Sequence, residues 1–386
     1  MPTLADVFRE YGPAYRARYG DRMLPSHHKA MDDIMACRTA ALGGEVFWCD
    51  ACQQYQYAYH SCGNRHCPTC GDDRADRWRD KQLQKRLPVP YFFVTFTLPH
   101  SLNAIARSHQ TLIYSLLFRT SAKTLQAIAL NPKWLGAQIG MVGVLQTWDR
   151  SMGYHVHVHW LLPAGGLDPQ TGAWKPANPR YLAPGSALRS VFRATFRDAL
   201  KAADPDLFAQ VPPDTWQVTW NVQCEAVGDG RRALKYLTPY LFRVAISNRR
   251  ILSLKDGHVT FSYKPRKKPW TTMNPDAMSF IRRFLQHVLP KGFQKIRYIG
   301  FLHPRAKTRF MALKQQLDEQ AAAAEQPVVT EPSADQTASK RHTPDAPGLC
   351  PHCGGPLRYL GPLPRWPTSH PLHAQRGPPH QQGGGS

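Results

Sequence analysis

The sequence is poor in acidic residues and lacks any long apolar segment. Among its 386 residues, 49 lysines and arginines outnumber 27 aspartates and glutamates, so the formal net charge is +22. No apolar run is long enough to span a bilayer, and the N-terminal residues lack the basic and apolar regions of a signal peptide. We therefore expect a cytoplasmic protein with no membrane partner, which binds a polyanion such as nucleic acid.

Nine cysteines are present, and in the cytoplasm cysteines bind metals or take part in chemistry more often than they form disulfides. Two Cys-x-x-Cys pairs lie on either side of residues 53–66; they are Cys49 with Cys52 and Cys67 with Cys70. This spacing predicts one tetrahedral structural zinc site, with each pair forming one knuckle. Cys62 is the most plausible substitute ligand. Cys37, His60 and His66 are further candidates, either for replacing a ligand or for building a second site.

A third pair, Cys350 and Cys353, looks like half of a zinc ribbon. No other Cys-x-x-Cys follows it, so its partners would be His352, His370, His373 or groups far away in the sequence. An unpaired remnant is an equally good interpretation.

The segment from Tyr154 to Leu162 carries three histidines at every second position. In a β-strand, His155, His157 and His159 would line one side, and the core-forming Val156, Val158 and Trp160 the other. A solvated strand face is the competing interpretation. Three imidazoles in register favour a divalent metal site, because histidine is the commonest metal ligand.

Two tyrosines, Tyr236 and Tyr240, stand four residues apart. On a helix this spacing places both phenols on one face, although Pro239 between them would kink a helix interior. Taken alone, the pair could be two half-buried aromatics.

Taken together, these motifs resemble the HUH single-strand DNA nucleases, and more closely the zinc-finger-bearing, rolling-circle insertion-sequence transposases of the two-tyrosine type. The resemblance runs from about Cys37 to Ile251. Its motifs, in order, are the cysteine segment 61–70, the strand segment 90–99, the histidine strand, and the tyrosine segment 236–248.

The resemblance implies an α+β fold, with an N-terminal cysteine-rich zinc module before a HUH nuclease domain built on a central antiparallel sheet flanked by helices. Together with changes in composition along the chain, the resemblance predicts four segments. They are a zinc-binding module (1–87), a nuclease domain (88–300), a helix and flexible linker (301–345), and a Cys-x-x-Cys remnant with a disordered tail (346–386). It also implies that the zinc module helps to bind DNA, and that the protein is bacterial and associated with the nucleoid.

The implied activity is the nicking and rejoining of single-stranded DNA through a 5′-phosphotyrosine. Tyr240 or Tyr236 would be the catalytic nucleophile, with a slight preference for Tyr240. His157 and His159 would hold magnesium or manganese. His155 would be either a third ligand or a residue that contacts the ligands without binding the metal. Another ligand is expected from a neighbouring element. Gln146 is favoured over Asp149, Gln223 and Glu225, because it lies on the strand expected to form a hairpin with the histidine strand.

Basic residues cluster after the tyrosines, close to the aromatic residues Tyr263 and Trp270. They are Arg243, Arg249, Arg250, Lys264, Arg266, Lys267 and Lys268. Each alone is an ordinary surface charge, but basic residues interleaved with aromatics suit single-stranded DNA, whose bases stack.

Two alternatives remain. A plasmid or phage replication initiator or relaxase shares the nuclease chemistry, and a non-catalytic zinc-binding regulator of DNA is a different class. The sequence has no P-loop helicase motif, so we expect unwinding to come from a host helicase, the replication machinery or supercoiling.

Overall fold

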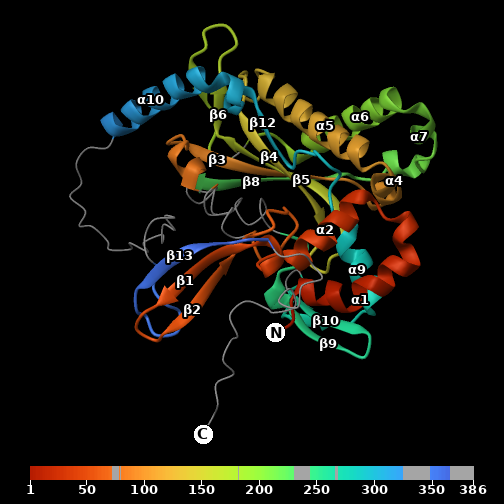
Figure 1. Ribbon diagram of the computed structural model, residues 1–386. Coiled ribbons are helices and arrows are strands. Elements are labelled where there is room, and N and C mark those ends of the chain that lie inside the picture. The colour runs from red at the N-terminus through yellow and green to blue at the C-terminus, as the bar shows by residue number, and fades with distance from the viewer. Residues whose placement is uncertain are drawn as a thin grey trace. The chain divides into compact units, whose positions relative to one another are not determined.

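The computed structural model describes residues 1–71, 78, 80–180, 182–229, 244–265, 268–324 and 348–365 (Figure 1). The chain divides into two compact units. The sheet unit comprises Met1–Pro2 and Gly71–Gln326, and the cysteine unit comprises Thr3–Cys70 and Pro327–Ser386. No described helix is both long and apolar enough to cross a membrane.

The sheet unit is built on a five-stranded antiparallel sheet of order β12-β4-β5-β3-β8. The strands are β3 (Pro90–Thr97), β4 (Met141–Trp148), β5 (Tyr154–Pro163), β8 (Asn221–Asp229) and β12 (Ile296–Ile299). The histidine strand β5 lies between β4 and β3, at the centre of the sheet. The predicted α+β class with a central antiparallel sheet is confirmed.

Helices cover one face of this sheet. They are α4 (Asn103–Ser108), α5 (Gln110–Leu130), α6 (Gly185–Ala203) and α7 (Pro205–Ala209). Their apolar side chains form the main core with alternate residues of β3 and β5, among them Phe96, Val158 and Trp160, all fully buried. Removal of these apolar side chains from water is the dominant stabilising contribution to the sheet unit. The expected core positions Val156, Val158 and Trp160 are confirmed.

Smaller elements surround the sheet. They are the β6–β7 hairpin (Gly165–Leu167 and Trp174–Pro176), the three-stranded sheet of β9 (Ile251–Lys255), β10 (His258–Tyr263) and β11 (Thr271–Met273), α9 (Ala277–Leu285) and α10 (Lys307–Ala324). Helix α9 packs on β10 through Phe261 and Phe280, whose ring centroids are 5.7 Å apart. The β9–β10 turn needs left-handed backbone at Asp256 and Gly257 (φ 51° and 73°), a combination that Asp-Gly adopts readily.

The cysteine unit combines both ends of the chain (Figure 1). It contains α1 (Leu4–Tyr19), α2 (Pro25–Ala36), β1 (Gly44–Cys49), β2 (Gln54–Tyr59) and β13 (Leu357–Leu363). Thr3 and Asp6 form a capping box that starts α1. The three strands form an antiparallel sheet of order β13-β1-β2, so a C-terminal strand completes an N-terminal hairpin.

These units differ from the four segments expected from the sequence. Residues 348–365, expected to be part of a remnant and tail, belong with the N-terminal residues because β13 pairs with β1. Leu87, expected at the end of the zinc module, belongs to the sheet unit, where its backbone N–H donates to the Tyr91 hydroxyl at 3.0 Å. Helix α10 also belongs to the sheet unit, through Phe310, Leu313 and Leu317.

Gly143 on β4 provides the space that Trp160 needs. The two residues are partners in the β4–β5 register, and the indole N–H of Trp160 donates to Ser121 of α5 at 2.9 Å. A Cβ at position 143 would lie 2.5–2.7 Å from the indole ring. The ring cannot withdraw, because it is fully buried and anchored by this hydrogen bond.

We predict that Gly143→Ala lowers the free energy of unfolding of the sheet unit by about 1–3 kcal/mol, the usual cost of overpacking a core. Urea unfolding followed by tryptophan fluorescence measures this loss. Gly185→Ala at the start of α6 is the matched control, because its Cβ would meet only the flexible guanidinium of Arg189. Equal losses in the two variants would contradict the steric explanation.

Candidate active site and metal centres

The three histidines of β5 lie on the sheet face opposite the main core. His157 and His159 are each 6% exposed, whereas His155, near the start of the strand, is exposed. On the flanking strands, Gln146 and Thr97 lie opposite His157, and Thr95 lies opposite His159. This end of the face is polar. Beyond His159 it becomes apolar, with Phe93, Val142 and Leu161 among its buried residues.

Hydrogen bonds orient the two buried imidazoles. Nδ1 of His157 lies 2.9 Å from the backbone carbonyl of His155, which can only accept, so Nδ1 carries the proton and Nε2 keeps its lone pair. Nδ1 of His159 lies 2.9 Å from the Thr95 hydroxyl. A metal-binding imidazole is commonly held in this way, with one ring nitrogen engaged by the protein and the other directed to the ion.

Burial keeps these imidazoles neutral. Burial, with a smaller contribution from the adjacent His155, lowers the pKa of His157 to about 3. Burial also holds the pKa of His159 well below its ordinary value, with His157 adding to the effect. Neutral imidazole is the form that binds metals, so both residues are in the ligating state at neutral pH.

Gln146 offers an oxygen beside them. Its amide nitrogen donates to the carbonyl of Trp148 at 3.0 Å, which fixes the amide orientation. The amide oxygen is buried and has no hydrogen-bond partner among the described residues. A buried polar atom left in this state costs about 1–3 kcal/mol. An unpartnered oxygen opposite His157, together with two neutral imidazoles, fits a divalent cation that accepts mixed nitrogen and oxygen ligands.

The remaining ligand candidates are placed less favourably. One carboxylate oxygen of Asp149 accepts from the backbone N–H groups of Ser151 and Gly153, and from the Ser151 hydroxyl. Gln223 and Glu225 are exposed on the edge strand β8. The three imidazoles do not offer ligand atoms that all lie within 4.8 Å of one another; within the described part of the chain, only two cysteine clusters meet that condition.

Several expected site residues fall outside the described residues: Tyr236, Tyr240, Arg243, Arg266 and Lys267. Of the other basic candidates, Arg249, Lys264 and Lys268 are exposed, as is Trp270. Arg250 has a structural role, because its guanidinium donates to the carbonyls of Ser262 and Arg150, each at 2.7 Å. It therefore ties the segment before β9 to β10 and to the turn that precedes β5.

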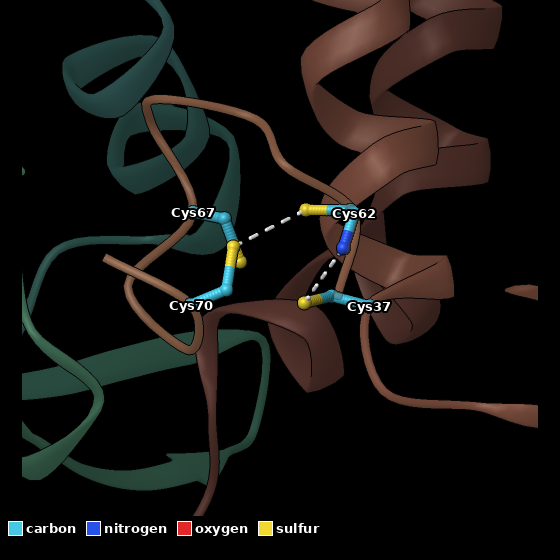
Figure 2. A group of neighbouring side chains, drawn as sticks. All are labelled: Cys37, Cys62, Cys67 and Cys70. Carbon is cyan, nitrogen blue, oxygen red and sulfur yellow. Dashed lines mark hydrogen bonds between the residues drawn. The ribbon is translucent and has the colours of Figure 1, made fainter. Parts of the chain in front are cut away.

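The first cysteine cluster is formed by Cys37, Cys62, Cys67 and Cys70, whose side chains converge in Figure 2. All four sulfurs lie within 4.8 Å of one another, and those of Cys62 and Cys70 are 3.7 Å apart. A tetrahedral zinc with Zn–S bonds of about 2.3 Å requires sulfur separations of about 3.8 Å, so the cluster fits zinc. Cys37 follows α2, and backbone N–H groups of Cys62 and Asn64 point to the sulfurs of Cys37 and Cys62.

The second cluster is formed by Cys49, Cys52, Cys350 and Cys353. The spacing of the two N-terminal pairs predicted a single shared site, but the structure separates them. Cys49 and Cys52 lie at the turn of the β1–β2 hairpin, whereas Cys37 and Cys62 lie near its open end. Six-residue strands separate the two ends by roughly 20 Å, too far for one ion. Cys62, expected as a substitute, and Cys37, expected as a possible second-site ligand, both belong to the first cluster.

Two known families match this chain. Residues 7–98 match a family described as "Transposase zinc-binding domain", and residues 140–309 match one described as "Putative transposase". The first match includes all four ligands of the first cysteine cluster, so that unit binds structural zinc. The second includes β4, β5 and all three histidines.

Two relatives align with most of the chain. "Putative transposase y4qJ" of Sinorhizobium fredii is 37% identical over 333 residues, which is 81% of this chain and 83% of the relative. "Transposase for insertion sequence element IS801" of Pseudomonas savastanoi pv. phaseolicola is 28% identical over 298 residues, 72% of this chain and 70% of the relative. No solved structure matches. With both domains in this order and an alignment of this extent, the chain belongs to the zinc-finger-bearing insertion-sequence transposases of the rolling-circle type.

Proposed function

We propose that this transposase nicks and rejoins single-stranded DNA at the ends of its element and at the target, through a 5′-phosphotyrosine. The observation that carries the proposal is the polar end of the central sheet face. There, two buried neutral imidazoles lie beside an amide oxygen that has no hydrogen-bond partner in the described part of the chain. Such a donor set suits an ion that acts on a phosphodiester, and the family to which the chain belongs moves DNA.

In this proposal His157, His159 and Gln146 hold magnesium or manganese, which would neutralise negative charge on the scissile phosphate. Tyr240 or Tyr236 attacks the phosphorus. A bond forms between the tyrosine oxygen and phosphorus, and the bond to the 3′ oxygen breaks, leaving a free 3′-hydroxyl. The phosphotyrosine retains the energy of the broken phosphodiester, so a 3′-hydroxyl can later attack it and rejoin strands without ATP.

His155 has a supporting role in the same proposal. Its backbone carbonyl fixes the ring of His157, whereas its own imidazole is exposed. We therefore assign its side chain to the surroundings of the site rather than to a ligand position. Burial lowers the pKa of the His155 imidazole and the nearby Asp149 carboxylate partly opposes this effect, so Asp149 belongs to the same surroundings.

Single-stranded DNA would follow the exposed basic residues near β10. Arg249, Lys264 and Lys268 supply charge for phosphates, and the indole of Trp270, 61% exposed, supplies a stacking surface for a base. A host helicase or the replication machinery would deliver the strand, which places the protein at the bacterial nucleoid.

The two alternative functions explain fewer of the observations. A replication initiator or relaxase would use the same chemistry, but it does not explain the transposase relatives or the matched zinc-binding domain. A non-catalytic regulator would have no need for two buried, neutral imidazoles, His157 and His159, beside the Gln146 amide.

We predict that Gln146→Leu weakens Mn²⁺ binding by about 10- to 100-fold, because one oxygen ligand is lost. Calorimetric titration of Mn²⁺ into the protein measures the affinity. The free energy of unfolding without metal should change by no more than about 1 kcal/mol, because removal of the unpartnered oxygen offsets the loss of the hydrogen bond from the amide nitrogen to the Trp148 carbonyl. An unchanged Mn²⁺ affinity would show that Gln146 is not a ligand.

The nuclease chemistry is tested with single-stranded oligonucleotides covering the element ends, in magnesium or manganese. We expect a covalent protein–DNA adduct on denaturing gels that is absent from the Tyr236→Phe/Tyr240→Phe double variant. Whichever single Phe variant lacks the adduct identifies the nucleophile. His157→Ala should form the adduct at least about 100-fold more slowly, because a metal ligand is lost.

His258→Ala is the control, since His258 is an exposed histidine on β10 whose ring nitrogen lies 2.9 Å from the carbonyl of Asp256 in its own turn. It should form adduct at the wild-type rate. Wild-type protein that binds these oligonucleotides but yields no adduct with either metal would overturn the enzymatic proposal and leave a DNA-binding protein.

A further inference from the structure

The second cysteine cluster joins two segments from opposite ends of the chain. Cys49 and Cys52 lie within the residues matched by the zinc-binding family, whereas Cys350 and Cys353 lie beyond both matched regions. The Sγ atoms of Cys49 and Cys353 are 3.4 Å apart, and those of Cys52 and Cys350 are 3.7 Å apart. All four sulfurs lie within 4.8 Å of one another. Disulfide sulfurs would be about 2.05 Å apart, so the four thiols are free.

The C-terminal half of this cluster has the backbone of a metal knuckle. The N–H of Cys350 donates to the carbonyl of Gly355 at 2.7 Å, and the N–H of Gly354 donates to the carbonyl of Cys350 at 2.8 Å. The N–H of Gly355 points to the sulfur of Cys353 at 3.4 Å. Gly354 has a φ of 73°, a conformation that a tight turn takes readily only with glycine.

Gly355 lets the two halves of the cluster approach each other. A Cβ at this position would lie 2.8 Å from the Cβ of Ala51, which stands between Cys49 and Cys52. It would also lie 3.3 Å from the sulfur of Cys353 and 3.5 Å from that of Cys49. The two Cys-x-x-Cys turns therefore pack directly against each other, as in a zinc ribbon.

Strand pairing sets the register of the two turns. β13 pairs with β1 from Gly44 opposite Leu363 to Cys49 opposite Leu357. Tyr359 strengthens this pairing, because its hydroxyl donates to the Glu45 carboxylate at 2.6 Å and its ring lies 5.5 Å from that of Phe47. Strand β13, whose pairing with β1 is interrupted only by one register shift between Val46 and Phe47, thus places the C-terminal knuckle beside the β1–β2 turn.

We infer that Cys49, Cys52, Cys350 and Cys353 bind a second structural zinc ion, so that the C-terminal segment closes a metal site begun near the N-terminus. Four thiols at tetrahedral separations match the thiolate set that zinc prefers. The inference does not depend on DNA cleavage, and its test does not measure cleavage.

The three-stranded sheet also needs such a site. Within β1, β2 and β13 only Gly44, Cys49 and Gln56 are buried, so the sheet has almost no apolar core of its own. A sheet of this kind relies on metal ions for stability. A zinc ion in the first cluster stabilises the open end of the β1–β2 hairpin. A zinc ion in the second cluster would link the turn of this hairpin to the segment before β13.

The test is the zinc content of reduced full-length protein, measured by native mass spectrometry and elemental analysis. Wild type should carry two zinc ions per chain, and Cys350→Ser/Cys353→Ser should carry one. Cys224→Ser is the control, because Cys224 lies on β8, outside both clusters, and it should keep two. One zinc in wild type, or two in the double variant, would overturn the inference.

A second measurement on wild-type protein covers the case in which the double variant does not fold. Mass spectrometry after iodoacetamide treatment reports which cysteines are alkylated. The peptide that carries Cys350 and Cys353 should be protected in the zinc-loaded protein and become reactive when a chelator removes the metal. Reaction of these two cysteines before chelation, or a disulfide from either of them to Cys49 or Cys52, would refute the site.

Discussion

The two-residue repeat of strand β5 is the constraint on which the proposed active site depends. Val156, Val158 and Trp160 face the helices, so their burial fixes which side of the strand His157 and His159 must occupy. A shift of one residue would expose the apolar set and bury the histidines in the main core. The stability of the helix-covered core therefore also positions the two buried imidazoles.

Burial of the two imidazoles determines their protonation state, but it also costs free energy because their polar nitrogens are removed from water. Desolvation keeps His157 and His159 neutral, and a neutral polar ring in the interior still needs hydrogen bonds. The His155 carbonyl and the Thr95 hydroxyl supply one to each ring. These contacts come from a backbone carbonyl and a threonine hydroxyl rather than from an acidic side chain, so they add no negative charge beside the proposed metal site.

Local patterns of the sequence predicted which residues share a face of β5 better than they predicted which cysteines cluster together. The alternation along β5 and the short turn before it were sufficient to place the histidines on one face and Gln146 on the adjacent strand, because strand periodicity and hairpins are local. The pairing of Cys-x-x-Cys knuckles is not local. It depends on the β1–β2 hairpin, which separates Cys49 from Cys62, and on β13, which brings Cys350 from the far end of the chain.

A metal site that combines cysteines from both ends of the chain remains favourable despite the long separation between Cys52 and Cys350 in the sequence. The entropy lost on closing a loop grows only with the logarithm of its length, so joining Cys52 to Cys350 costs only about 3 kcal/mol more than joining Cys52 to Cys67. Metal–thiolate bonds and the β1–β13 ladder then have to offset a modest entropy, which is why an exposed sheet with almost no apolar core can include a strand from the other end of the chain.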